Sequence, residues 1–365
     1  MPSSGVARSR PRPPQPPRRP TVLAAHGDRR VDEYHWLRDR EDPQVLAHLE
    51  AENAYTDACT AHLSGLRERL YEEIVGRILE TDLSVPVRKG PFAYYSRTEA
   101  GRQYPIRCRR PLGPGGEGPE QVLLDENALA PDGGYLALGT FDVSPDHRLL
   151  TYSVDRSGAE RFALAFLDLE TGQPTGEVIE DTYFGAVWAA DGRTVFYTRP
   201  DAAMRPFQLW RYQLGLPGSH QLVYEEPDER FHVGVQRTKD DAFVVVSCQS
   251  RLTTEARLID ARRPLEEPRL LERRRQGVEY SLGHLDGRFL ILTNDEAEDF
   301  RLVEAPDSDP SRASWRELVA HRPGVRLESV EEFRSHLALF ERAEGVSRLS
   351  VVDLADGSRH VVPQP

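Results

Sequence analysis

Two histidines near the N-terminus lie close in sequence to several aspartates, a combination that could perform acid–base chemistry. His26 and His35 stand within a few residues of Asp28, Asp32 and Asp39. General acid–base catalysis needs such groups to be held against a reacting group. Neither a nucleophile nor a strand end accompanies them, so a polar network that fixes this segment is the better interpretation.

A search for a serine nucleophile gives one incomplete match. A G-x-S-x-G elbow holds the serine on a strained turn between a strand and a helix, where side chains would not fit. The nearest match runs from Gly345 to Leu349 around Ser347. It lacks the final glycine, and its flanks indicate a turn between two strands. We therefore assign no catalytic residue to this chain.

Acidic pairs and possible metal ligands also give no site. Neighbours in an extended strand point to opposite faces, so adjacent acids are not automatically a catalytic couple. We expect solvated loop charges at the three pairs Glu225–Glu226, Glu266–Glu267 and Glu331–Glu332. The thiols of Cys59, Cys108 and Cys248 are scattered, and no HExxH, P-loop or GxGxxG motif occurs. We expect free thiols, no metal, no cofactor-binding residue and no cofactor.

Composition limits the class of partner. The 365 residues carry a net charge of −12, which disfavours nucleic acid and suits cationic ligands, although acidity also serves solubility alone. No apolar run approaches the roughly 18 residues that span a bilayer, and the N-terminus lacks the apolar core of a signal peptide. We therefore expect a cytoplasmic protein without membrane contact. Of 47 basic residues only Lys89 and Lys239 are lysine, which we attribute to the codon bias of a GC-rich genome.

The first 84 residues predict a tail and a helical arm. Residues 1–20 alternate proline with arginine and should be a disordered tail. Within the arm, residues 21–84, Asp42-Pro43 is a typical helix start, and Gly65 could divide the helix in two. One apolar face continues at spacings of three or four through Leu63, Leu66, Leu70, Ile74 and Ile78. Two helices of this length cannot bury the apolar face between themselves. The apolar face therefore needs a partner.

From residue 85 onward the sequence repeats. Polar turns at Asp146, Asp191, Asp240 and Asp286 recur about every 45 to 50 residues, each followed by an apolar strand. Weaker copies surround Lys89–Tyr95 and Arg334–Phe340, which gives six units. Such a period with short strands is typical of a β-propeller, in which strands are buried on both faces. A pair of β-sandwiches is the alternative. No Trp-Asp dipeptide occurs, which speaks against WD40 repeats.

A second strand is expected after each turn and its apolar strand. We place these strands at Phe162–Asp168, Gln208–Tyr212, Glu255–Asp260, Phe300–Glu304 and Arg348–Asp353. Where the turn is Asp-Gly, glycine supplies the positive φ that a tight hairpin needs.

Several segments resemble a known family. The stretch from His26 to Asp39, with its Trp-Leu-Arg-Asp end, resembles the opening signature of the oligopeptidase B (protease II) branch of the prolyl oligopeptidase family of serine peptidases. Three further segments look similar to that branch: Leu49–Tyr55, Leu222–Asp228 and Val278–Leu282. Arg38 favours this branch over prolyl oligopeptidase itself, which usually has an acidic residue after Trp-Leu.

The resemblance implies a two-part enzyme. In the family, N-terminal helices pack on an α/β-hydrolase domain, and a seven-bladed propeller restricts access to short peptides. A Ser-His-Asp triad in the hydrolase domain then cleaves after basic residues in this branch. Because the sequence ends at Pro365 after six units, we expect the last blade and the hydrolase domain to be absent, and with them every catalytic residue.

We therefore predict a mainly β fold, in which a helical arm at residues 21–84 precedes an incomplete β-propeller at residues 85–365, with about six of seven blades. The function predicted is the N-terminal, size-restricting region of a serine-type endopeptidase, inactive alone. Its expected partners are short Arg/Lys peptides and the missing hydrolase domain, with no nucleic acid and no membrane. The alternatives are a stand-alone propeller that binds peptides or proteins, a prolyl oligopeptidase with proline specificity, and another propeller enzyme such as a glycoside hydrolase.

Overall fold

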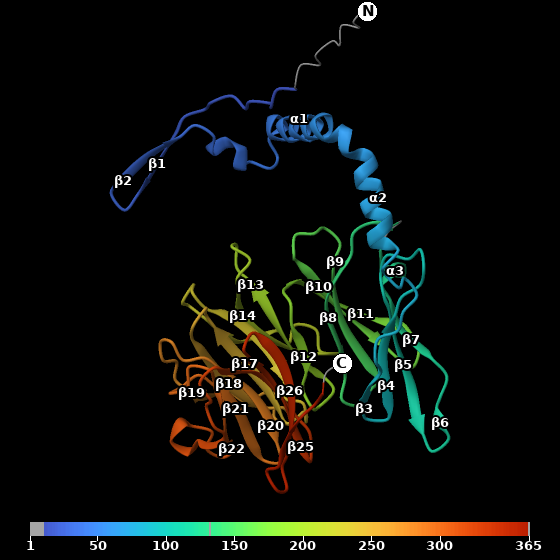
Figure 1. Cartoon of the computed structure of the whole chain (residues 1–365), viewed down its shortest axis with the longest axis vertical. Helices are drawn as coiled ribbons and strands as arrows, with labels where there is room; N and C mark the ends of the chain where they lie inside the picture. Colours follow the sequence, from blue (N-terminus) through green and yellow to red (C-terminus); the bar gives the residue numbers. More distant parts are fainter. Residues whose placement is uncertain (1–10, 131–132, 364–365) are drawn as a thin grey trace, which may run out of the picture. The chain divides into compact units, whose positions relative to one another are not determined.

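The structure is a computed structural model that describes residues 11–130 and 133–363 (Figure 1). The chain divides into two compact units, which we call unit 1, up to Asp82, and unit 2, from Leu83. The sequence alone places this boundary at residues 84 and 85. Each unit is described by itself below.

Unit 1 begins with a hairpin that the sequence analysis missed. Strands β1 (Thr21–Ala25) and β2 (Asp28–Asp32) pair in antiparallel fashion. The two residues between them, His26 and Gly27, both have positive φ, at 53° and 82°. A two-residue turn of this kind matches the twist of paired strands, and a glycine at its second position is the usual sign of it. The His-Gly pair was therefore a readable signal.

The proline- and arginine-rich segment before the hairpin contacts Trp36 and Asp42 of the same unit. Residues 1–10 of the expected tail lie outside the described residues, and residues 11–20 carry no helix or strand. Trp36 Nε1 nevertheless donates to Pro17 O at 3.0 Å. The guanidinium of Arg19 lies 4.1 Å from the centre of the Trp36 ring and within 3.5 Å of the Asp42 carboxylate. The Trp-Leu-Arg-Asp signature thus holds the preceding chain.

Unit 1 contains four helical segments, and α1 starts where the sequence indicates. They are η1 (His35–Arg38), α1 (Pro43–Thr60), η2 (Ala61–Leu63) and α2 (Ser64–Val75). Asp42 caps α1 by accepting a hydrogen bond from Gln44 N at 2.8 Å. The break falls at η2 rather than at Gly65, which lies inside α2, so that detail of the prediction is wrong.

The apolar face of these helices is exposed. Helix α2 buries none of its residues, and α1 buries only Val45. Among the described residues, large apolar side chains remain open to solvent at Leu46, Leu49, Leu66, Leu70, Tyr71 and Ile74. Unit 1 therefore presents a stripe that its own residues do not cover.

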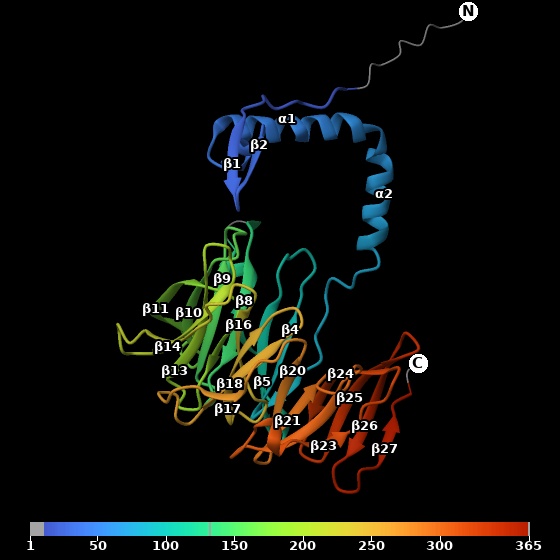
Figure 2. The ribbon, with the colours of Figure 1, turned by 90° about the vertical axis from the view of Figure 1, so that its left-hand side faces the viewer.

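Unit 2 consists of six antiparallel sheets that follow one another in the chain (Figure 2). We number them 1 to 6. Sheet 1 contains β3 (Val87–Lys89), β4 (Phe92–Arg97), β5 (Ile106–Gly113), β6 (Gly116–Glu117) and β7 (Gln121–Asp125). Sheet 2 contains β8 (Ala137–Val143), β9 (Leu149–Asp155), β10 (Phe162–Asp168) and β11 (Gln173–Thr182). Helix α3 (Glu126–Leu129) lies in the sequence between these two sheets.

The other four sheets each have four strands. Sheet 3 contains β12 (Ala186–Trp188), β13 (Thr194–Pro200), β14 (Pro206–Gln213) and β15 (Gln221–Glu225). Sheet 4 contains β16 (His232–Arg237), β17 (Phe243–Gln249), β18 (Thr254–Asp260) and β19 (Arg269–Glu272). Sheet 5 contains β20 (Tyr280–Leu285), β21 (Arg288–Thr293), β22 (Arg301–Pro306) and β23 (Arg316–Val319), and the short helix η4 (Arg312–Ser314) lies between its last two strands in the sequence. Sheet 6 contains β24 (Val325–Glu332), β25 (His336–Ala343), β26 (Val346–Asp353) and β27 (Arg359–Val361).

The sheets are the blades of a propeller. The first strands of neighbouring sheets contact one another, β8 with β12, β12 with β16, and β20 with β24. First strands therefore lie innermost, and the colours pass from sheet to sheet around them in Figure 2. The predicted six-unit propeller is confirmed, and the alternative of two β-sandwiches is wrong. The strands β10, β14, β18, β22 and β26 match those expected as the second strand of each unit.

The recurring aspartates shape the turns between the first two strands of a sheet. Asp191 accepts hydrogen bonds from the backbone N–H groups of Arg193 and Thr194, at 3.0 and 2.8 Å. Asp146 and Asp240 accept in the same way from the residue two positions later. An aspartate that accepts a hydrogen bond from the backbone just after it closes a turn, which explains why this residue recurs in these three repeats.

The core lies between sheets rather than within one. Phe196 and Leu209 of sheet 3 pack on Val244, Val246 and Cys248 of sheet 4. Similar clusters join sheets 1 and 2, 2 and 3, 4 and 5, and 5 and 6. The strands β9, β13, β17 and β21 are buried on both faces along most of their length, which explains their unbroken apolar sequences.

A core truncation tests this packing. Phe289 of β21 has no exposed surface, whereas Phe340 of β25 is 40% exposed. We predict that Phe289→Ala lowers the free energy of unfolding by about 3–5 kcal/mol, because it leaves a cavity between sheets 4 and 5. Phe340→Ala should cost below about 1 kcal/mol. Urea titration followed by tryptophan fluorescence measures both, and equal losses would contradict the packing.

Candidate functional site

Charged side chains gather where the first strands end. Lys89, Asp142 and Arg237 stand at or next to the last residue of β3, β8 and β16, and Glu331 stands near the end of β24. Lys239 follows β16 in the turn. We call these five residues the ion belt. Because the first strands surround the axis of the propeller, the belt lies around one end of that axis.

Asp142 connects four sheets within the ion belt. Its Oδ1 accepts from Arg237 of sheet 4 at 3.0 Å and lies 3.7 Å from Lys89 Nζ of sheet 1. Its Oδ2 accepts from the backbone N–H of Trp188 in sheet 3 at 3.1 Å. The Trp188 indole also donates to Asp142 O at 3.2 Å. A single carboxylate thus satisfies donors from three neighbours, as a buried charge requires.

The other side of the belt joins sheets 4, 5 and 6. Lys239 Nζ lies 2.9 Å from Glu331 Oε2 of sheet 6. Beside it, His284 Nδ1 of sheet 5 lies 2.6 Å from Asp240 Oδ2 of sheet 4. Burial alone would raise the pKa of Asp240, but its hydrogen bonds to His284 and Thr238 outweigh burial and lower that pKa. Sheets 4 to 6 are therefore tied at the same end as sheets 1 to 4.

Sheets 3 and 4 share a second, buried group of charges near the starts of the first strands. We call Glu226, Glu255, Arg257 and Arg274 the buried cluster. Arg274 NH2 lies 2.5 Å from Glu226 Oε2, and its Nε donates to Glu255 Oε2 at 3.2 Å. Arg257 NH1 donates to Glu255 Oε1 at 2.6 Å.

The expectation of a solvated charge is wrong for Glu226, which is only 1% exposed. Glu226 directly follows β15 and contacts the Arg274 side chain. No sequence pattern indicates this contact. Burial alone would raise the pKa values of Glu226 and Glu255. The hydrogen bonds and positive charge of Arg274 outweigh burial, so both pKa values are lowered. Both carboxylates are therefore ionised at neutral pH.

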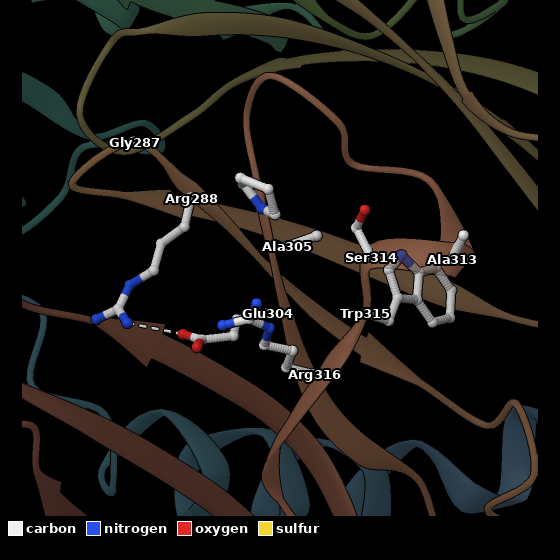
Figure 3. A pocket seen from close by; sticks show the side chains of 9 residues that line it. Gly287, Arg288, Glu304, Ala305, Ala313, Ser314, Trp315 and Arg316 are labelled. Atoms are coloured by element: carbon white, nitrogen blue, oxygen red, sulfur yellow. Dashed lines mark hydrogen bonds and ion pairs between the residues drawn. The ribbon is translucent and has the colours of Figure 1, made fainter.

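Sheet 5 carries a surface pocket of about 490 Å³ (Figure 3). Arg288 and Glu304 form one wall and are joined by an ion pair of 2.7 Å. Trp315 and Ser314 form the opposite wall, and the Ser314 hydroxyl donates to Asp309 Oδ2 at 2.6 Å. That serine closes its own loop and has an acid rather than a base as its partner. The pocket therefore offers contact surface but no assembled nucleophile.

The residues first considered for chemistry are not brought together. His26 lies in the β1–β2 turn, while His35 Nδ1 is 3.7 Å from Asp32 Oδ2 and its ring contacts Arg38. Ser347 lies in the exposed start of β26 and not on an elbow. The described residues contain no group of three His, Cys, Asp or Glu side chains that could hold a metal ion. Among the same residues, no helix has the length and hydropathy needed to cross a membrane.

Comparison with known proteins identifies the family. Residues 13–364 match the model described as the prolyl oligopeptidase, N-terminal beta-propeller domain. The chain belongs to the prolyl oligopeptidase family. The match agrees with the predicted resemblance and with the six blades of unit 2.

Curated relatives include two peptidases of bacteria. Dipeptidyl aminopeptidase BI of Pseudoxanthomonas mexicana is 40% identical over 369 residues, which covers 96% of this chain and 51% of the relative. Protease 2 of Moraxella lacunata is 34% identical over 333 residues, which covers 90% of this chain and 48% of the relative. The chain thus spans about half the length of the curated relatives it matches.

Solved structures agree with these relatives. Oligopeptidase B from Leishmania major superposes with a TM-score of 0.87 at 28% identity, over 97% of this chain and 54% of that one. Oligopeptidase B from Trypanosoma brucei with covalently bound antipain gives 0.83 at 30% identity, over 94% and 52%. The chain is therefore similar to the N-terminal propeller half of oligopeptidase B, as the signature around Trp36 indicates.

The buried cluster gives a prediction with a defined pH dependence. Arg274→Met removes the cation between two buried carboxylates and should cost about 3–5 kcal/mol at pH 7. Because the folded-state pKa values of Glu226 and Glu255 lie below their unfolded values, the stability they contribute is present above about pH 5 and is lost as the pH falls through the folded values. The gap between wild type and Arg274→Met should therefore narrow from pH 7 to pH 4 in urea titrations.

A matched control is the exposed pair of Arg263 and Asp260, at 3.1 Å. Arg263→Met should change the free energy of unfolding far less than Arg274→Met, because water screens this pair, and its difference from wild type should change little between pH 7 and pH 4. A gap for Arg274→Met that stays constant or widens toward pH 4 would contradict the ionised cluster.

Proposed function

We propose that this chain is the size-restricting propeller of a longer serine peptidase that cleaves short peptides after basic residues. One observation carries the proposal: nearly the whole chain matches about half the length of proteins named as peptidases, and the matching family model is that of an N-terminal propeller. The chemistry would belong to a catalytic domain outside this sequence, with serine attacking, histidine as base and an acid orienting it.

The ion belt supports the size restriction. It draws sheets 2 and 4, and sheets 4 and 6, toward one another across the axis of the propeller. Side chains that meet across an axis leave little room for a folded chain to pass. A propeller placed over a catalytic centre would then admit extended, short peptides and exclude folded proteins.

The preference for basic residues is supported by charge and by Arg38. A net charge of −12 creates a field that attracts cationic peptides and raises their local concentration. Arg38 in the Trp-Leu-Arg-Asp signature favours the oligopeptidase B branch over proline-specific relatives.

We also propose the cytoplasm as the location of the protein.

A second specificity is favoured by one observation. The relative at 40% identity is named a dipeptidyl aminopeptidase, whereas the one at 34% is named protease 2. We propose that the same serine chemistry could serve either activity, and that the two would differ in which peptide bond reaches the serine. Mass spectrometry of products from an internally placed arginine distinguishes them.

The first functional prediction concerns catalysis. The purified chain should not hydrolyse an arginyl chromogenic peptide and should not react with a serine-directed fluorophosphonate, because the proposal places the activated serine in a catalytic domain outside this sequence. If the coding sequence continues beyond Pro365, the longer protein should do both, and a serine-to-alanine change at its G-x-S-x-G elbow is the control. Turnover by the chain alone, blocked by the fluorophosphonate, would refute the proposal. A continued reading frame without such an elbow would favour a stand-alone binding module.

The second functional prediction concerns the arm. We propose that the exposed stripe of α2 packs on the catalytic domain, so in the isolated chain it should bind an apolar dye such as ANS. Replacing Leu66, Leu70 and Ile74 together with serine should lower dye fluorescence severalfold and leave urea unfolding of unit 2 unchanged. Unchanged dye fluorescence would show that this stripe is not the exposed apolar surface.

A further inference from the structure

The only two lysines of the chain both belong to the ion belt. Lys89 is the last residue of β3, and Lys239 follows β16 in the turn to β17. The other 45 of the 47 lysine and arginine residues are arginine. Codon bias explains why lysine is rare, but it does not explain why both lysines stand at the same end of the propeller axis.

The two amino acids differ in how firmly they hold a carboxylate. Arginine presents a planar fork that fixes an ion pair, whereas the lysine ammonium is a compact, strongly hydrated charge on a flexible stem. A lysine therefore suits a contact that opens and closes, and an arginine suits one that stays closed.

The ion belt contains contacts of both kinds, and Arg237–Asp142 and Lys239–Glu331 show the difference most clearly. Arg237 and Asp142 are 7% and 18% exposed at their side chains, and the pair is held further by Asp241 on Arg237 and by Trp188 on Asp142. Lys239 and Glu331 are 45% and 54% exposed. The first pair is a fixed link between sheets 2 and 4, while water and salt reach the second freely.

The surroundings of Lys239 allow a change of position without loss of every contact. Its ammonium lies 3.9 Å from the centre of the Phe333 ring, directly after β24, as well as 2.9 Å from Glu331. Phe333 is itself 42% exposed and stacks on His336. When the ion pair with Glu331 breaks, the face of the Phe333 ring can still bind the Lys239 ammonium. The ion pair and the cation–π contact are therefore alternative interactions of the same side chain.

We propose that Lys239 and Glu331 form a salt-sensitive latch across the end of the propeller axis. When closed, it ties sheet 6 to sheet 4 past sheet 5 and narrows that end. When open, it frees β24 to move away from β16, so that the end widens, while the Arg237–Asp142 link keeps sheets 2 and 4 together. The consequence for peptide size rests on the function proposed above, whereas the latch itself is a property of this chain.

Carbodiimide cross-linking tests the contact directly. The reagent joins an amine to a touching carboxylate, and two lysines give few products. We expect a Lys239–Glu331 cross-link by peptide mass spectrometry at low ionic strength, its yield falling severalfold near 1 M NaCl, where the screening length is about 3 Å. Glu331→Gln should abolish it. Absence of this product from the wild-type chain, or a yield independent of salt, would overturn the latch.

Hydrogen exchange tests the motion. In Lys239→Met, which keeps the stem but loses the charge, amides of residues 325–332 should exchange about two- to fivefold faster, the change that loss of an exposed ion pair permits. Lys239→Arg should retain protection. The matched control is Glu328→Gln on the same strand, since Glu328 pairs with Arg342 inside sheet 6 at 2.7 Å. Equal exchange in Lys239→Met and wild type, or equal acceleration by Glu328→Gln, would overturn the proposal.

The longer peptidase tests the consequence for peptides. There Glu331→Gln should raise kcat/KM for a peptide of roughly 30 residues relative to a dipeptide substrate, with kcat/KM for the dipeptide unchanged. An unchanged ratio would remove the latch from size selection. If the wild-type longer protein cleaves neither substrate, the proposed function fails, while the cross-linking and exchange results still decide the latch.

Discussion

The packing of one sheet on the face of the next is the constraint on which the rest of unit 2 depends. Each of sheets 2 to 5 packs apolar residues against both of its neighbours, and clusters such as Phe196 with Val244 form only between two sheets. The order of the sheets in the sequence is therefore also their order around the axis of the propeller. That order carries the ends of the first strands to one place, where side chains far apart in sequence can meet.

Charge then refines what apolar packing assembles. The contact between Arg237 and Asp142 joins residues 95 positions apart, and that between Lys239 and Glu331 joins residues 92 apart. Each of these contacts needs strands of two different sheets to hold its partners, so neither can form within one segment of the sequence. The buried cluster around Arg274 fixes one interface permanently, whereas the exposed lysine contact leaves another adjustable. Within one fold the chain thus combines rigid and movable links.

Local patterns predicted much of the fold, and non-local contacts account for what they missed. The turn aspartates and β10, β14 and β18 follow from short-range hydrogen bonds and burial, which the sequence displays. The His26–Gly27 hairpin was readable but overlooked beside a helical pattern. The burial of Glu226 and the shared place of both lysines depend on other sheets, so no window of sequence contains them. For the same reason the candidate site emerged only from the arrangement of the strands.

Native-state hydrogen exchange in rising urea tests most directly whether the sheets stabilise one another face to face. The account predicts that the central strands β9, β13, β17 and β21 of sheets 2 to 5 open with one shared free energy, because removing any one of these sheets exposes the faces of its neighbours. If one of these strands exchanges through its own low-energy opening while the adjacent strands stay protected, the account is contradicted.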